Sequence, residues 1–355
     1  MFGIKETKAQ FNNLKEEISK MSISEGKPSK TSSFVGFFKN TKYAVKLIFL
    51  EKEIIAFAVL QLIVIGLGYY LWVQMLDWIP EEVWRSTRNS SNGSVADIVL
   101  ILWSFVCVGL VTFPLGLLSA CMGAAHFLHS QGKESTIAGC FRIVLPRSWP
   151  LWLFSWIDGW WTVNQILERL PKKNDKTPRS KKILKEALYQ AWRLATLGIL
   201  PALVIGRSIK EACTDSLGLL KNRFVPLIKL RIGYSTICWI FGIACYISVI
   251  LIFPFIKTNM KSEFDVYSFY FLAGVPLLIA LAFIQLIFRP IYIISACRIY
   301  SDYVKEKEIA VNLPDKTPKV ISVLVVFSII CIILAIVYIF RNELGIIKLL
   351  SVPYK

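Results

Sequence analysis

Five polar side chains between residues 149 and 208 have the types and the spacing to form a site within a membrane. The candidate site comprises Asp158, Thr162, Gln165, Gln190 and Arg193. The first three follow one another at intervals of four and three residues, so they share one face of a predicted helix. Gln190 and Arg193 form a comparable stripe in a second apolar arm, and we expect Asp158 to pair with Arg193 when the arms pack.

This pair has a functional and a structural interpretation. An ionisable side chain at membrane depth costs about 2.5–3.5 kcal/mol on insertion scales, so it marks a candidate functional site. Asp158 would then be a proton or cation site, and Arg193 its gate or counter-charge. In the structural interpretation a salt bridge pins the two arms, while tryptophans on the opposite helical face anchor it at the head-group boundary. These tryptophans are Trp149, Trp152, Trp156 and Trp160.

The sequence contains none of the motifs that mark common enzymes or metal sites. It has no Gly-rich phosphate-binding loop, no His-Glu-x-x-His and no Gly-x-Ser-x-Gly. His126 and His129 lie three residues apart, but no carboxylate accompanies them at metal-ligand spacing. The eight cysteines include no Cys-x-x-Cys pair. We therefore expect no enzymatic activity, no cofactor and no metal.

The elements that must position these side chains are long apolar helices. The chain is 55% hydrophobic and 13% aromatic, above the roughly 45–50% apolar content of soluble domains. Several runs reach the roughly 20 residues that a helix needs to cross a bilayer. We predict an all-α integral membrane protein with five full transmembrane helices, at residues 54–76, 98–118, 232–256, 267–288 and 320–340.

Charge distribution decides how the stretch 149–208 is interpreted. The net charge is +17, and the segments that we assign to the inner side hold 34 of the 41 Lys and Arg residues. This balance requires the basic segment 169–193 to stay inside. We therefore predict that 149–208 is a re-entrant, hemi-penetrating hairpin, with seven spans as the alternative. The location that follows is the bacterial inner membrane, with the N-terminus cytoplasmic and the C-terminus outside.

Basic residues flanking the apolar segments predict contact with anionic phospholipids. The segment Ser33–Phe49 alternates apolar and basic residues at helical spacing, as interfacial helices do. The lysines expected to contact head groups are Lys39, Lys42, Lys46, Lys172, Lys173, Lys181 and Lys182. The run 172–185 has no interleaved aromatic residues, so we expect no nucleic-acid binding. A homo-oligomer or membrane-protein partners remain open.

Two short matches suggest a parallel internal repeat. Residues 36–40 resemble residues 218–222, and Pro114 followed by Ser119-Ala120-Cys121 resembles Pro290 followed by Ser295-Ala296-Cys297. Chance similarity between apolar helices is the alternative. The predicted divisions are a disordered cytoplasmic arm at 1–30, membrane repeat 1 at 31–148, the hairpin at 149–208, membrane repeat 2 at 209–310, and a final span with an external tail at 311–355.

This organisation resembles bacterial multi-span integral membrane proteins of unknown function. The features that carry the resemblance are the basic lead-in, two spans, the Ala-rich extension at 120–132, the Trp-rich arm, and the stretch 192–216 with its proline. More loosely, the hemi-penetrating arms are similar to those of the etoposide-induced and sulfate-permease-like membrane family. We expect transport or handling of a small solute or lipid. The alternative is a non-transporting scaffold or assembly factor that binds lipids and partner proteins.

Overall fold

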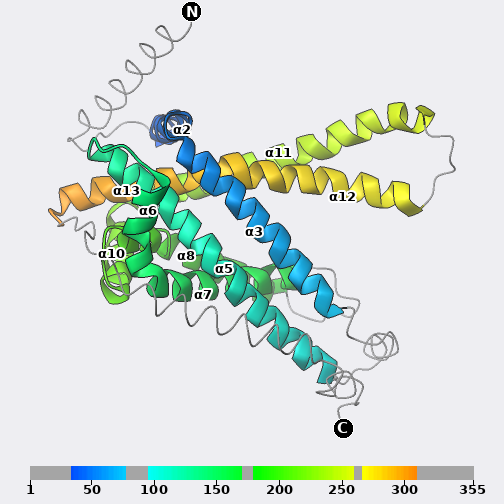
Figure 1. Cartoon of the computed structure of the whole chain (residues 1–355), viewed down its shortest axis with the longest axis horizontal. Helices are drawn as coiled ribbons and strands as arrows, with labels where there is room; N and C mark the ends of the chain where they lie inside the picture. The colour runs from blue at the N-terminus through cyan, green and yellow to red at the C-terminus, as the bar shows by residue number, and fades with distance from the viewer. Residues whose placement is uncertain (1–32, 77–94, 170–178, 260–265, 310–355) are drawn as a thin grey trace, which may run out of the picture. The chain divides into compact units, whose positions relative to one another are not determined.

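The computed structural model describes residues 33–76, 95–169, 179–259 and 266–309. Within these ranges the chain is all helical, with 91% helix and no strand, which confirms the predicted fold class. The elements are α2 (Ser33–Leu50), α3 (Lys52–Leu76), α5 (Val95–Ser130), α6 (Ile137–Val144), the 3-10 helix η1 (Leu145–Arg147), α7 (Ser148–Arg169), α8 (Arg179–Ala195), α9 (Ile199–Val204), α10 (Ile209–Asn222), α11 (Phe224–Asn259), α12 (Val266–Phe283), the π-helix η2 (Ile284–Phe288) and α13 (Arg289–Glu306) (Figure 1).

Five segments of the described chain are long and apolar enough to cross a membrane, as in an integral membrane protein. They are Lys52–Gln74, Ile101–Ser130, Lys185–Val204, Phe224–Ile252 and Gly274–Glu306. Four of them overlap predicted spans. The predicted span 320–340 lies outside the described residues, as do the predicted cytoplasmic arm and the external tail.

The segment Lys185–Val204 differs from the other four because its helix is interrupted. Helix α8 ends at Ala195, a turn covers residues 196–198, and α9 resumes for six residues. Gly198 has a low helix propensity and lies at the break, which explains why the helix does not continue. The residues that join α7 to α8 lie outside the description, so re-entry and crossing of 149–208 both remain predictions.

The chain divides by its internal contacts into two compact units. Unit 1 takes the described residues within Met1–Leu62, Ser119–Cys140 and Ala191–Leu313. Unit 2 takes those within Ile63–Leu118, Phe141–Gln190 and Pro314–Lys355. The predicted divisions follow chain order, whereas these units follow contacts between residues. The units therefore do not test the predicted divisions, which stay predictions.

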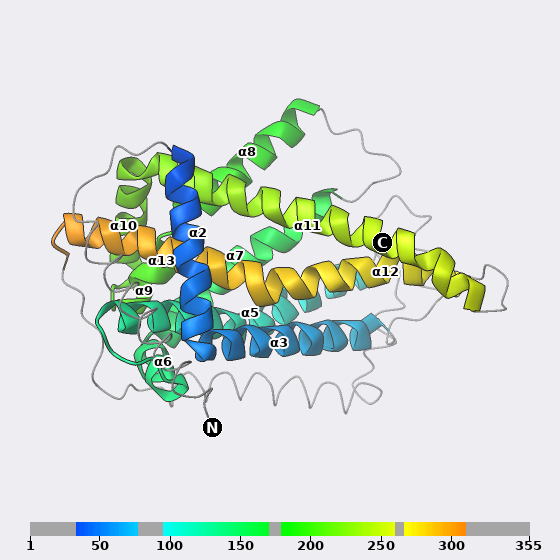
Figure 2. The same ribbon diagram turned by 90° about the horizontal axis from the view of Figure 1, so that it is seen from above.

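In unit 1, α2 crosses α11 and α13, and α11 lies beside α12 (Figures 1 and 2). Helix α2 packs through Tyr43, Ala44 and Leu47, which lie on one face and are buried. Lys39 and Lys42 are exposed on α2, in agreement with its predicted amphipathic character. The helix thus has one face in the protein core and exposed lysines outside that face.

In unit 2, α7 packs closely on the part of α5 that ends at Leu118. Glycines allow this approach: a Cβ on Gly109 would lie 2.5 Å from the Trp156 ring, and one on Gly159 would lie 2.6 Å from Thr112. The Trp152 indole N–H donates to the carbonyl of Gly109 at 2.7 Å. The tryptophan face of α7 is therefore partly committed to helix packing, while Trp149 at its start is exposed.

Candidate functional site

The sequence-predicted polar site is divided between the two units. Asp158, Thr162 and Gln165 follow one another on α7 and are half-buried, and the Thr162 hydroxyl donates to the Asp158 backbone carbonyl at 2.7 Å. In α8, the Gln190 amide donates to Glu186 at 2.7 Å. Arg193 belongs to unit 1, whereas Asp158 belongs to unit 2. The pairing of Asp158 with Arg193 stays a prediction.

Unit 1 contains a polar cluster that sequence reasoning did not identify. Gln61 Nε2 donates to Ser119 Oγ at 2.8 Å, and Gln285 Nε2 donates to Gln61 Oε1 at 2.5 Å. Arg289 completes the cluster, since its guanidinium donates to Gln285 Oε1 at 3.1 Å and to Ser119 Oγ at 3.5 Å. These four bonds form a closed circuit, which we call the polar ring.

The polar ring lies inside three candidate membrane spans. Gln61 is in α3 and is fully buried, Ser119 is in α5, and Gln285 and Arg289 are in the segment Gly274–Glu306. Three of the four side chains are at most 6% exposed. A buried amide without partners costs several kcal/mol in an apolar medium, on the order of 2–7. The ring therefore satisfies groups that the surrounding apolar helices could not.

A π-helix positions two members of the ring. Gln285 belongs to η2, a five-residue π-helix, and Arg289 follows directly after it. Pro290 has no N–H and its ring would crowd the carbonyl of Leu286 in a regular α-helix, so the wider turn accommodates it. Single π-turns inside α-helices are rare and frequently accompany functional sites. The local backbone thus marks the same place as the polar side chains.

The chemistry of the polar ring suits an anionic or strongly polar oxygen group. The Arg289 guanidinium presents donors in a planar fork that matches carboxylate and phosphate. The amides of Gln61 and Gln285 add both donors and acceptors. Among the described residues no group of three or more His, Cys, Asp or Glu is arranged to hold a metal.

The two histidines contact different partners. His129 Nδ1 lies 2.8 Å from Glu51 Oε1, and the Ser135 hydroxyl donates to Glu51 Oε2 at 2.5 Å. His126 Nδ1 lies 3.2 Å from the Tyr43 hydroxyl. The carboxylate stands between Ser135 and His129, so the histidine cannot take a proton from the serine as it would in a catalytic triad. This arrangement fastens the end of α5 to the start of α3.

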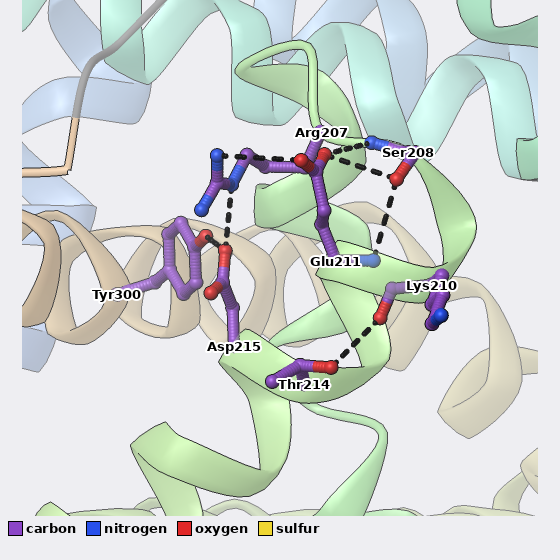
Figure 3. Close-up of polar contacts among 7 residues, drawn as sticks. All are labelled: Arg207, Ser208, Lys210, Glu211, Thr214, Asp215 and Tyr300. Atoms are coloured by element: carbon purple, nitrogen blue, oxygen red, sulfur yellow. Dashed lines mark hydrogen bonds and ion pairs between the residues drawn. The ribbon is translucent and has the colours of Figure 1, made fainter.

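A second group of polar contacts joins α10 to α13 (Figure 3). Arg207 Nε donates to Asp215 at 2.8 Å, and the Tyr300 hydroxyl donates to the same carboxylate oxygen at 3.2 Å. The hydrogen bond to Asp215 raises the pKa of Arg207. Next to it, Ser208 and Glu211 form a capping box that begins α10. We call Arg207, Asp215 and Tyr300 the α10 clamp.

Comparisons with known protein families, curated proteins and solved structures found no match to this chain. The resemblances described from the sequence therefore remain predictions. The polar ring itself had a sequence signal, because Gln61 and Gln285 are isolated amides in long apolar runs. Applying the rule for intramembrane polar residues to every span, and not only to 149–208, would have selected them.

Proposed function

We propose that this protein moves or handles a small solute or lipid that carries an anionic or strongly polar oxygen group, without catalysing a reaction. The polar ring is the observation that carries the proposal. A recognition site for such a group needs hydrogen-bond donors at membrane depth, and Gln61, Ser119, Gln285 and Arg289 all carry N–H or O–H donors.

The presence of arginine supports recognition over simple bracing. Neutral amides and hydroxyls suffice to link helices in a membrane, and such links are worth about 0.6 kcal/mol on average. A cation at the same depth adds an insertion cost of about 2.5–3.5 kcal/mol. The guanidinium is the member of the polar ring that distinguishes an anionic oxygen group from a neutral one.

Flux measurements on the purified chain test the proposal. The protein is reconstituted in liposomes, and two readouts are taken: release of trapped inorganic phosphate, and loss of fluorescence of a head-group-labelled lipid when dithionite is added outside. We expect at least one readout to exceed that of protein-free liposomes. Arg289→Gln should then reduce the rate at least about tenfold, because a hydrogen bond to a charged group contributes about 1.5–3 kcal/mol and about 1.4 kcal/mol corresponds to tenfold.

The matched control is Gln74→Leu, which removes an amide from α3 outside the polar ring. Its flux should equal that of the unaltered protein. If a folded, monodisperse protein releases phosphate and exposes labelled lipid no faster than protein-free liposomes do, the proposal is overturned.

A scaffold or assembly factor is the second candidate function. The observation that favours it is the closure of the polar ring, because the four side chains bond to one another as a brace would. In that case Arg289→Gln lowers the stability of the protein, and no flux exists for it to reduce. The same liposome experiment therefore separates the two candidates.

We further propose a bacterial inner membrane location, with the N-terminus cytoplasmic and the C-terminus outside. The excess of Lys and Arg in the segments assigned to the inner side supports it. Exposed Lys39 and Lys42 on α2 suit contact with anionic phospholipid head groups. Thr177→Cys in a Cys213→Ser background tests the topology with a membrane-impermeant maleimide. Labelling from outside in intact cells would contradict the re-entrant hairpin.

A further inference from the structure

Unit 2 contains a cavity of about 500 Å³ between α7 and α8, bordered by Phe105 of α5. This volume lies within the roughly 300–1,000 Å³ range of small-molecule sites. Its α7 wall is a stripe at helical spacing, and the stripe changes character along the helix. Leu153, Trp156 and Trp160 are apolar, whereas Asn164 and Gln165 at its end are polar.

The aromatic wall is held in place by α5. The Trp156 indole N–H donates to the Phe105 carbonyl at 3.0 Å, and the two rings lie 4.9 Å apart. Trp160 meets Phe105 edge-on at 5.0 Å, and Trp152 stacks on Trp156 at 5.8 Å. The Trp156 N–H is thus bonded to a backbone carbonyl, so this indole offers the cavity its apolar ring. The wall is ordered before any ligand arrives, which lowers the entropic cost of binding.

The polar end of the cavity carries a positive charge. Among the described residues that line it, Lys185 is the one ionisable side chain. The Tyr189 hydroxyl lies 3.5 Å from Thr162 Oγ1 and sets α8 against α7. Lys185 precedes Tyr189 by one turn and Gln165 follows Thr162 by less than one turn, so the cation and the amides border the same cavity.

We propose that this cavity binds an anionic phospholipid of the surrounding bilayer. One acyl chain lies along the tryptophans, and the phosphate accepts hydrogen bonds from Lys185, Asn164 and Gln165. The match is one of charge and polarity: an apolar wall that ends in amides and a cation suits a molecule with an apolar chain and an anionic head. Gln165, predicted from the sequence as part of a polar site, acquires a role in this one. The proposal concerns unit 2 alone and does not depend on the polar ring of unit 1.

Quenching of tryptophan fluorescence by brominated lipids tests the proposal. The full-length chain in detergent is titrated with phosphatidylglycerol or phosphatidylcholine, each brominated on its acyl chain. We expect phosphatidylglycerol to bind about fivefold more tightly, because one Lys near an anionic head group contributes about 1 kcal/mol. Lys185→Ala should abolish this preference, and Lys185→Arg should keep it. Trp160→Leu should remove part of the saturable quenching.

Controls on other helices make the outcome decisive. Lys210→Ala on α10 removes an exposed lysine, and Trp239→Leu on α11 removes an exposed tryptophan. Neither should change the preference for phosphatidylglycerol. Unaltered thermal unfolding of each variant shows that it is folded. Equal affinity for both lipids, or an equal loss in Lys210→Ala, would overturn the proposal. The proposal would also be overturned if free fatty acid displaces the bound brominated lipid and unbrominated phosphatidylglycerol does not. Flux in liposomes is a separate readout, so this result and that of the proposed function can fail independently.

Discussion

The Gln285 amide donates a hydrogen bond of 2.5 Å to the Gln61 side-chain oxygen, across 224 residues of sequence. The bond joins α3 to the π-helix η2, and both side chains are buried. It closes the polar ring, because Gln61 also bonds to Ser119 and Gln285 also accepts from Arg289. Two glutamines in apolar segments thus hold together helices that lie far apart in the chain.

Replacing either glutamine should destabilise the protein, and the two effects should be coupled. Gln61→Leu or Gln285→Leu leaves a buried partner unsatisfied, which costs about 1–3 kcal/mol. A double-mutant cycle should give a coupling energy of about 0.6–1.7 kcal/mol, between the average and the largest value found for hydrogen bonds between membrane helices. Denaturant unfolding in detergent gives the free energy of unfolding of the unaltered protein, the two single variants and the double variant. Gln74→Leu is the control outside the ring, and additive effects of the two glutamine changes would contradict the direct bond.

The extents of the helices could be predicted from the sequence, because they depend on residues that are neighbours in the chain. The sequence pattern continues the helix of the second span past Pro114 to about residue 129, and α5 ends at Ser130. The pattern likewise continues the next-to-last predicted span past Pro290 to about residue 305, and α13 ends at Glu306. Hydropathy and helix propensity are properties of neighbouring residues, so they locate helices well.

The contacts within the polar ring could not be predicted from the sequence in the same way. Its four members come from three segments, and their meeting depends on how helices are rotated and shifted against one another. The π-turn at Ile284–Phe288 adds a rotation that apolar periodicity does not report. The sequence shows an apolar arm with Pro201 that is shorter than a full span, but the break at residues 196–198 was not predicted. The hydrogen bonds from Trp152 and Trp156 to backbone carbonyls of α5 could not be predicted, because an apolar helix face can pack against either lipid or protein.

Gly109→Ala should destabilise unit 2 although alanine favours helices. A Cβ at this position would lie 2.5 Å from the Trp156 ring, and a shift of this rigid ring would disturb its indole hydrogen bond to the Phe105 carbonyl. The change also disturbs the Trp152 bond to the Gly109 carbonyl. Overpacking of this kind costs about 1–3 kcal/mol. Thermal unfolding followed by near-ultraviolet circular dichroism, which reports on tryptophan packing, should register the loss.

Gly242→Ala on α11 is the matched control for this prediction. A Cβ there meets nothing within 4 Å, so only the gain in helix propensity remains, about 1 kcal/mol at most. We expect equal or higher thermal stability for this variant. Similar effects of both substitutions would show that the contact between Gly109 and Trp156 is not formed.

Cys140 should resist alkylation at neutral pH, whereas Cys213 should react. Burial raises the pKa of the Cys140 thiol to about 12, with Glu53 and Glu51 adding to the shift. The nucleophilic thiolate is therefore scarce near pH 7 and becomes abundant only as the pH approaches that pKa. Cys213 is exposed on α10. Partial labelling with N-ethylmaleimide and peptide mass spectrometry should show Cys213 modified first, and modification of Cys140 at the same rate would show that its surroundings are open.

The α10 clamp makes the last prediction, for Asp215→Asn. This change removes the charge that accepts hydrogen bonds from Arg207 and Tyr300, while the shape of the side chain is kept. Charged hydrogen bonds contribute about 1.5–3 kcal/mol when buried, and the partial exposure of Arg207 reduces the expected loss to about 1 kcal/mol. Amide hydrogen exchange in α10 should rise severalfold. Glu211→Gln is the control, because Glu211 lies 3.9 Å from Arg207 in an exposed pair and glutamine also forms capping boxes. If amide hydrogen exchange in α10 rises equally in Asp215→Asn and Glu211→Gln, the helix cap and not the α10 clamp holds α10 in place.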